Sequence, residues 1–306
     1  MIATSAGPRT WIGTREYSQW IDTPLSGADM SPDGWGVGGT LLNGGGWQKK
    51  SFGSHKTYQL SWRSSSTREA AAIMQGYYSG TWGEGLIHFH DPLTYDTNVL
   101  PAGWADPSLA TRGGFSHIPG LTPTASRFTW GDRPYNFRLQ NYPLNWTRYE
   151  IPAGASVVGR RLYVPIPEGH SLHLGGVWQG TPSVALKVRR VKADGVTYGP
   201  AFTLESVPSY DERVTTSEIV GGTDAGVEIW IEKTGTLSGT IDIKAMTGRL
   251  LPSFRQPDVI QLGPWVGGQG NSGCEFDGVP TLINHTGVNG GQVSYAATLK
   301  EVGSWL

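Results

Sequence analysis

Cysteine, charge and long apolar runs are all scarce in this chain of 306 residues. Cys274 is the single cysteine, so no internal disulfide can form and a thiolate metal cage is excluded. Charged residues make up 16% of the chain, against about 25% in typical soluble domains. The 24 basic and 25 acidic side chains nearly cancel, which leaves a formal charge of −1. The sequence therefore offers no general positive field for wrapping nucleic acid or for holding an anionic membrane surface.

No run approaches the roughly 20 consecutive apolar residues that span a bilayer. The N-terminus also lacks the basic and then apolar pattern of a signal peptide. We therefore expect a soluble chain that is not inserted in a membrane and that no evident signal exports.

Glycine and aromatic residues are abundant instead. Glycine accounts for 44 residues, about twice its average share, and the chain has 13 Trp, 12 Tyr and 8 Phe. Turns should be frequent, and aromatic side chains should supply the core and the interfaces.

Short runs with apolar residues two apart, separated by Gly, Pro, Asn and Asp, predict a mainly β fold. We expect strands at 57–63, 85–90, 161–165, 171–174, 183–191, 226–232 and 239–245. The glycines at 44–46 are expected to lie in a segment that is rich in turns. One short helix is expected after the hydroxyl cluster 64–67, ending near Gly76 or Gly80, because strong helix formers follow that cluster.

Composition shifts predict two domains, one of them split. Loop-like stretches near 104–123 and 251–253 enclose a block of short strands. We expect residues 117–251 to form an inserted β-sandwich, and residues 1–116 with 252–306 to form a β domain that carries the helix.

No catalytic or cofactor motif is found. The sequence has no G-x-S-x-G elbow, no H-E-x-x-H motif and no phosphate-binding loop, and its acids single out no pair for glycoside hydrolysis. His88 and His90 would share one face of a strand, but two ligands do not make a metal site. We expect no enzymatic activity, no cofactor and no metal.

Trp178 and Tyr210 lie in segments that are expected to be loops of the inserted sandwich. Exposed aromatic rings in such positions stack on sugars, so these two residues are the predicted glycan contacts.

An ordered set of segments resembles the minor tail proteins of siphophages that infect actinobacteria, and more distantly the distal tail protein family. The segments are 44–47 (GGGW), 54–62 (SHKTYQLSW), 86–92 (LIHFHDP), 98–101 (NVLP), 104–105 (WA), 276–280 (FDGVP), 289–294 (NGGQVS) and 301–306 (EVGSWL). The resemblance covers the N-terminal third and the last fifty or so residues, and the middle only weakly.

This resemblance implies a belt-like split β-sandwich that assembles into a homo-oligomeric ring, expected to be a hexamer, at the tail tip of a virion made in the host cytoplasm. The inserted domain would be a galectin-like or carbohydrate-module-like jelly roll. The implied partners are further copies of the chain, the tail tube protein, and the tail-tip hub or other minor tail proteins. DNA would pass through the lumen without specific binding.

Three hypotheses follow. The first is a structural protein that links the tail tube to the host-recognition apparatus, or baseplate. The second is a carbohydrate-binding or receptor-binding tail protein that recognises host cell-wall glycans. The third is a glycan-degrading enzyme, which would require release of reducing sugar that a single Asp or Glu substitution abolishes.

Overall fold

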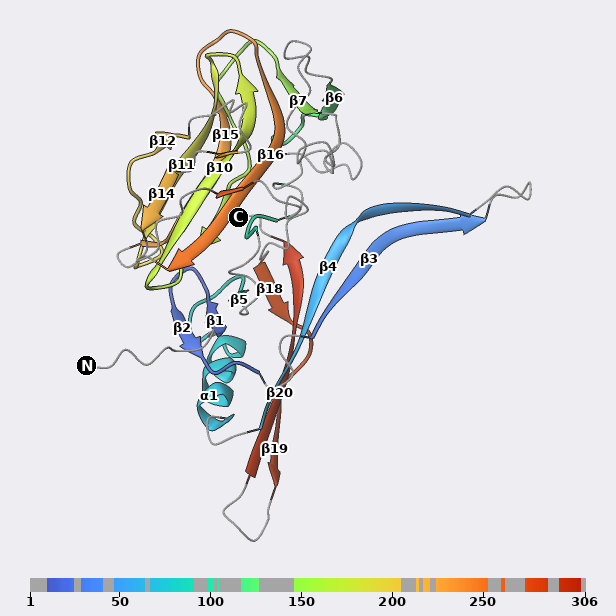
Figure 1. Ribbon diagram of the computed structural model, residues 1–306, viewed down its shortest axis with the longest axis vertical. Coiled ribbons are helices and arrows are strands. Elements are labelled where there is room, and N and C mark those ends of the chain that lie inside the picture. Colours follow the sequence, from blue (N-terminus) through green and yellow to red (C-terminus); the bar gives the residue numbers. More distant parts are fainter. Residues whose placement is uncertain are drawn as a thin grey trace. The chain divides into compact units, whose positions relative to one another are not determined.

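The computed structural model describes residues 10–24, 29–40, 47–63, 67–90, 98–101, 104, 117–126, 146–204, 213–214, 217–220, 224–252, 260–261, 273–285 and 292–303. Across these residues the chain is mainly β, with antiparallel strands and one short helix (Figure 1). The predicted fold class is confirmed. The chain divides into two compact units, Met1–Pro92 with Ser272–Gly303, and Leu93–Asn271 with Ser304–Leu306.

The first unit combines early and late strands in one antiparallel sheet. Its order is β18, β20, β4, β3, and β19 also pairs with β20. The bounds are β3 (Asp29–Thr40), β4 (Trp47–Arg63), β18 (Gly273–Phe276), β19 (Thr281–His285) and β20 (Gln292–Gly303). Because β20 pairs with residues 57–63 of β4, the last strand of the chain lies beside the fourth.

A smaller sheet and the helix complete the core of this unit. The sheet consists of β2 (Ser18–Ile21), β1 (Thr10–Gly13) and β5 (His88–His90), in that order. Helix α1 (Thr67–Tyr78) ends between the two glycines that predicted its end. Its Ile73, Met74 and Tyr77 share one buried cluster with Trp62 of β4 and Leu299 of β20.

Strands β3 and β4 continue beyond their sheet as a two-stranded arm, here called the β3–β4 arm (residues 32–40 and 47–56; Figure 1). They pair from Asp29 opposite Gln59 to Thr40 opposite Trp47, whereas β20 reaches β4 only as far as Thr57. The glycines at 34, 36, 38 and 39 lie within β3, whereas residues 44–46, which were expected to be rich in turns, lie outside the described residues. Pairing with β4 supplies the backbone hydrogen bonds that a strand needs, and this overrides the low strand propensity of glycine.

The second unit is a sandwich of two antiparallel sheets. One has the order β14, β10, β16, β7, β6, and the other has the order β12, β11, β15, β8, with β9 also paired to β15. The bounds of the first sheet are β6 (Thr124–Ser126), β7 (Trp146–Ile151), β10 (His170–Gly180), β14 (Ser217–Val220) and β16 (Gly239–Pro252). Those of the second are β8 (Val157–Val158), β9 (Leu162–Pro165), β11 (Val184–Lys192), β12 (Phe202–Thr203) and β15 (Asp224–Lys233), and β13 (Arg213–Val214) forms a separate pair with β17 (Ile260–Gln261).

Apolar residues from both sheets meet in one core, including Leu172 and Ile243 from one sheet and Leu186 and Ile229 from the other. Strands at all seven predicted positions are present, with shifted ends. The alternation of apolar and polar residues predicted these strands correctly, because each sheet has one face on the core. The second unit also takes in residues 98–101, whose Val99 and Leu100 pack in this core.

Candidate functional site

The alternating sequence of β11 places two kinds of side chain on opposite faces of its sheet. Val184, Leu186 and Val188 face the sandwich core, so Lys187 and Arg189 lie on the other face. The neighbouring strands contribute aromatic and acidic groups to that second face. We call this surface the polar face, and it consists of Arg161, Tyr163, Lys187, Arg189, Tyr198, Glu228, Trp230 and Glu232.

On the polar face, Glu228 binds Arg189, and Arg189 in turn packs against the ring of Tyr198. Arg189 and Glu228 are directly paired across β11 and β15. The Nε and Nη2 atoms of Arg189 each lie 2.6 Å from Glu228 Oε2. The guanidinium carbon of Arg189 lies 3.6 Å from the ring centroid of Tyr198. Glu228 is buried, whereas Tyr198 is 41% exposed. The buried carboxylate of Glu228 therefore fixes the guanidinium of Arg189, which packs against the exposed ring of Tyr198.

Trp230 forms the centre of the polar face. Its indole Nε1–H donates to Glu232 Oε2 at 2.8 Å. The guanidinium carbons of Arg161 and Arg189 lie 5.3 and 5.7 Å from its ring centroid, and Trp230 is only 3% exposed. The two cations thus lie over an indole that the fold keeps away from solvent.

A glycine makes room for the third aromatic ring of this face, that of Tyr163. Tyr163 of β9 lies against Gly226 of β15, where an added Cβ would come within 2.7 Å of the tyrosine ring. The Tyr163 hydroxyl donates to the Ala225 carbonyl at 3.2 Å. Any side chain at residue 226 would therefore displace this ring.

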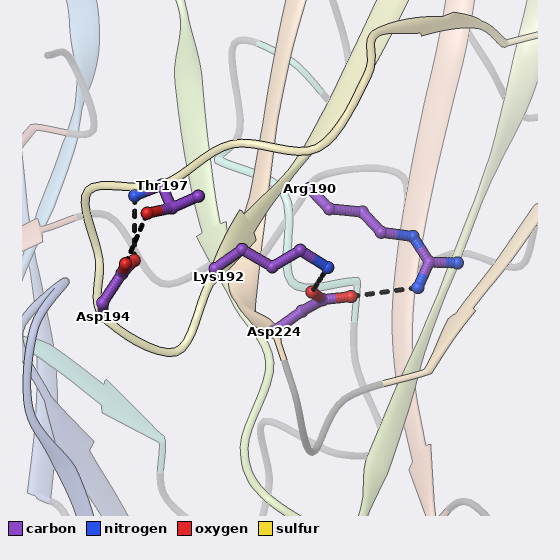
Figure 2. Close-up of polar contacts among 5 residues, drawn as sticks. All are labelled: Arg190, Lys192, Asp194, Thr197 and Asp224. Carbon is purple, nitrogen blue, oxygen red and sulfur yellow. Dashed lines mark hydrogen bonds and ion pairs between the residues drawn. The ribbon is translucent and has the colours of Figure 1, made fainter.

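The end of β11 carries a second charged group, shown in Figure 2. Asp224 is buried and accepts hydrogen bonds from Arg190 Nη1 at 2.9 Å and from Lys192 Nζ at 2.7 Å. In the following turn, Asp194 accepts a hydrogen bond from the Thr197 hydroxyl and others from the backbone N–H groups of Thr197 and Val196. These hydrogen bonds, that of the Thr197 hydroxyl first, lower the pKa of the Asp194 carboxyl. The turn returns the chain to place Tyr198 opposite Val191, so it positions the exposed ring.

Only one of the two predicted glycan contacts lies within the described residues. Trp178 lies within strand β10, not in the loop that was expected, and it packs in the sandwich core at 7% exposure. Its neighbours Gly175 and Gly176 are also strand residues, paired with Thr247 and Met246. Tyr210 lies outside the described residues. At its observed position, Trp178 presents little of its ring to a sugar.

His88 and His90 lie on β5, as expected, and both are buried. Phe89 between them is also buried, so this strand is covered on both faces. The His90 ring lies 4.9 Å from that of Trp11. Within the described ranges, no three or more His, Cys, Asp or Glu residues are grouped so as to hold a metal ion. No helix in the described part of the chain is both long and apolar enough to cross a membrane.

Sequence reasoning missed the polar face. A signal was present in β11, where Lys187, Arg189, Arg190 and Lys192 follow one another within a single strand of a chain that is poor in charge. The sequence of β11 alone does not predict the register with β15, which places Arg189 opposite Glu228.

No family model matches the chain, and no curated protein matches it. Among solved structures, "Structure of infectious bursal disease virus Gt strain" is 10% identical, with a TM-score of 0.24, covering 98% of this chain and 76% of that chain. "Crystal structure of infectious bursal disease virus VP2 subviral particle" is 12% identical, with a TM-score of 0.19, covering 95% of this chain and 75% of that chain. TM-scores this low do not indicate a shared fold.

Proposed function

We propose that this chain is a structural protein of a virion, a subunit of the tail tip of a siphophage. In this proposal, copies of the chain form a closed ring that joins the tail tube to the host-recognition apparatus. The neighbours are the tail tube protein and the tail-tip hub or other minor tail proteins, and DNA passes through the lumen without specific binding. The assignment to a tail tip comes from the resemblance of the sequence segments to siphophage minor tail proteins. One structural feature supports the assembly of copies into a ring.

That feature is the β3–β4 arm. A two-stranded ribbon is marginally stable in water unless it packs against something else. Strand β3 weakens the arm further, because it contains Pro32 and glycines at 34, 36, 38 and 39. Among the described strands, β4 pairs with β3 alone over residues 47–56. A neighbouring copy would supply the missing contacts.

An arm on one copy that packs against a different surface of the next copy makes a heterologous contact. Repeated by rotation, such contacts either close into a ring or continue as a filament. A tail-tip role requires closure, and a sixfold ring is the expected form.

The experiment is a comparison of the full chain with a chain in which residues 34–54 are replaced by Asn-Gly, so that the paired residues Asp33 and His55 flank the new turn. This change removes most of the arm and keeps residues 57–63 of β4, which pair with β20. Light scattering should give the mass of a closed oligomer for the full chain and of a monomer for the shortened chain. An oligomer that survives the shortening would overturn the role of the arm.

The second candidate function is recognition of host cell-wall glycans. Its structural support is the exposed ring of Tyr198, backed by Arg189 on the polar face. The proposal assigns no catalytic step to the chain.

A further inference from the structure

We propose that the polar face of the second unit binds an anionic polysaccharide. Tyr198 stacks on a sugar ring, and Arg161 pairs with an acidic group of the same polymer. This inference does not rest on ring assembly, because all of the residues involved belong to one unit of one chain. It rests on the second candidate function, glycan recognition, and names the class of glycan.

Tyr198 has the properties of a stacking platform. Its ring is exposed, and its position is set by the guanidinium of Arg189, which Glu228 holds through two N–H groups. An aromatic ring that is already fixed loses little conformational entropy when a sugar packs on it. The Asp194 turn holds the backbone that leads into Tyr198, since it bonds Val196 and Thr197.

Arg161 remains able to bind an incoming acid. Its side chain is 41% exposed, and its Nη1 lies 4.0 Å from Glu228 Oε2, which is longer than a hydrogen bond. It lies over Trp230, which keeps the guanidinium at the surface of the sheet. A planar guanidinium in this setting suits a carboxylate, which it binds through two parallel hydrogen bonds.

The net formal charge of the polar face is positive, because the face holds three cations and two acids. Glu228 is buried beneath Arg189, with a side chain only 2% exposed, and Glu232 accepts the hydrogen bond from Trp230. Lys187 adds a further cation and donates to the Thr203 hydroxyl at 2.8 Å. With both acids engaged, an anionic ligand complements the face better than a neutral one.

The spacing of the contacts favours a polymer. Arg189 touches both Tyr198 and Trp230, and Trp230 in turn touches Arg161. The side chains of Arg189 and Trp230 therefore lie between the Tyr198 ring and Arg161. We expect a ligand that contacts both to extend over more than one sugar ring.

Binding of the full chain to polygalacturonate, measured by calorimetry at low and high salt, tests the proposal. Fully methyl-esterified polygalacturonate has the same backbone without charge, and polyglutamate has carboxylates without sugar rings. We expect binding to polygalacturonate that weakens with salt, and much weaker binding to the ester, to polyglutamate and to monomeric galacturonate. No binding to polygalacturonate, equal binding to its ester, or equal binding to polyglutamate would each overturn the proposal.

Substitutions locate the site. Arg161→Ala should weaken binding roughly tenfold or more, and Tyr198→Ala should weaken it roughly three- to tenfold, whereas Tyr198→Phe keeps the ring and the affinity. Tyr78→Ala is the matched control, because Tyr78 is also 41% exposed but lies on α1 of the first unit. Unchanged affinity in both Arg161→Ala and Tyr198→Ala, with unfolding curves like that of the unsubstituted chain, would place binding elsewhere and refute the assignment.

Discussion

Ile87 and Cys274 exchange both of their backbone hydrogen bonds. The Ile87 N–H donates to the Cys274 carbonyl at 2.9 Å, and the Cys274 N–H donates to the Ile87 carbonyl at 2.7 Å. Both residues are buried in the core of the first unit. The contact joins β18 to the segment that leads into β5, so early and late parts of the chain complete one core.

A chain that ends at residue 271 therefore lacks β18, β19 and β20 and should lose the first unit. The second unit should stay folded, because its core comes from residues within 93–271. Limited proteolysis followed by mass spectrometry checks this. We expect residues 146–204 and 224–252 to resist digestion in both the full and the truncated chain, and residues 67–90 to resist only in the full chain. Protection of residues 67–90 in the truncated chain would refute the split arrangement.

Substitution of Lys233 should destabilise the second unit. This lysine is fully buried, and its Nζ donates to the carbonyls of Pro152, Gly154 and Ala155 at 3.1 to 3.2 Å. Lys233→Met keeps the length of the side chain but leaves these carbonyls without their donor, at an expected cost of about 2 kcal/mol in the free energy of unfolding. The matched control is Lys187→Met on the same sheet, which should change stability by about 0.5 kcal/mol or less. Equal effects of the two substitutions in urea unfolding would contradict this role.

His117 should make the stability of the second unit fall with acid. Burial lowers the pKa of His117 to about 3 from its ordinary 6.5. The folded ring therefore stays neutral, while the unfolded chain takes up a proton as the pH drops below 6.5. Between these two values the unfolded chain binds more protons, so the free energy of unfolding falls with decreasing pH, by up to about 1.4 kcal/mol per pH unit.

The variant that isolates this effect replaces both partners of one hydrogen bond. His117 Nδ1 lies 2.6 Å from the Tyr149 hydroxyl, so His117→Phe with Tyr149→Phe removes the titrating group and leaves neither polar atom of that bond behind. Urea unfolding at pH 7, 6 and 5 should show a shallower loss of stability in the double variant. Parallel pH profiles would contradict a neutral, buried His117.

Gly76 is expected to be required for packing of α1. A Cβ at this position would overlap the indole of Trp82. Gly76→Ala should therefore destabilise the first unit by about 1–3 kcal/mol, even though alanine is the better helix former. Adding Trp82→Ala should recover part of the loss, because it removes the overlapping ring. A single Gly76→Ala substitution that stabilises the chain in thermal unfolding would show that the indole lies elsewhere.

Local patterns predicted the elements of this fold well. The alternation in β11 reflects one face on the core and one face away from it, and the hydroxyl cluster before residue 68 marked the start of α1. The glycines of β3 gave no strand signal, because glycine content does not encode the pairing of β3 with β4. Trp178 was misread for the same reason, since its glycine-rich surroundings belong to a strand paired with β16.

The polar face could not be predicted from local sequence patterns. Its central contacts join Arg161 of the segment before β9, Arg189 of β11 and Trp230 of β15. Only the register of these strands brings the residues together, and register depends on how the whole core packs. The buried positions of His88 and His90 likewise depend on which elements cover β5.

Electron microscopy of the purified full chain in negative stain tests most directly whether copies of this chain form the proposed closed ring. Class averages should show rings with a central opening and a single rotational symmetry, expected to be sixfold. Single copies of the chain at every protein concentration, or open filaments without closure, would contradict the account.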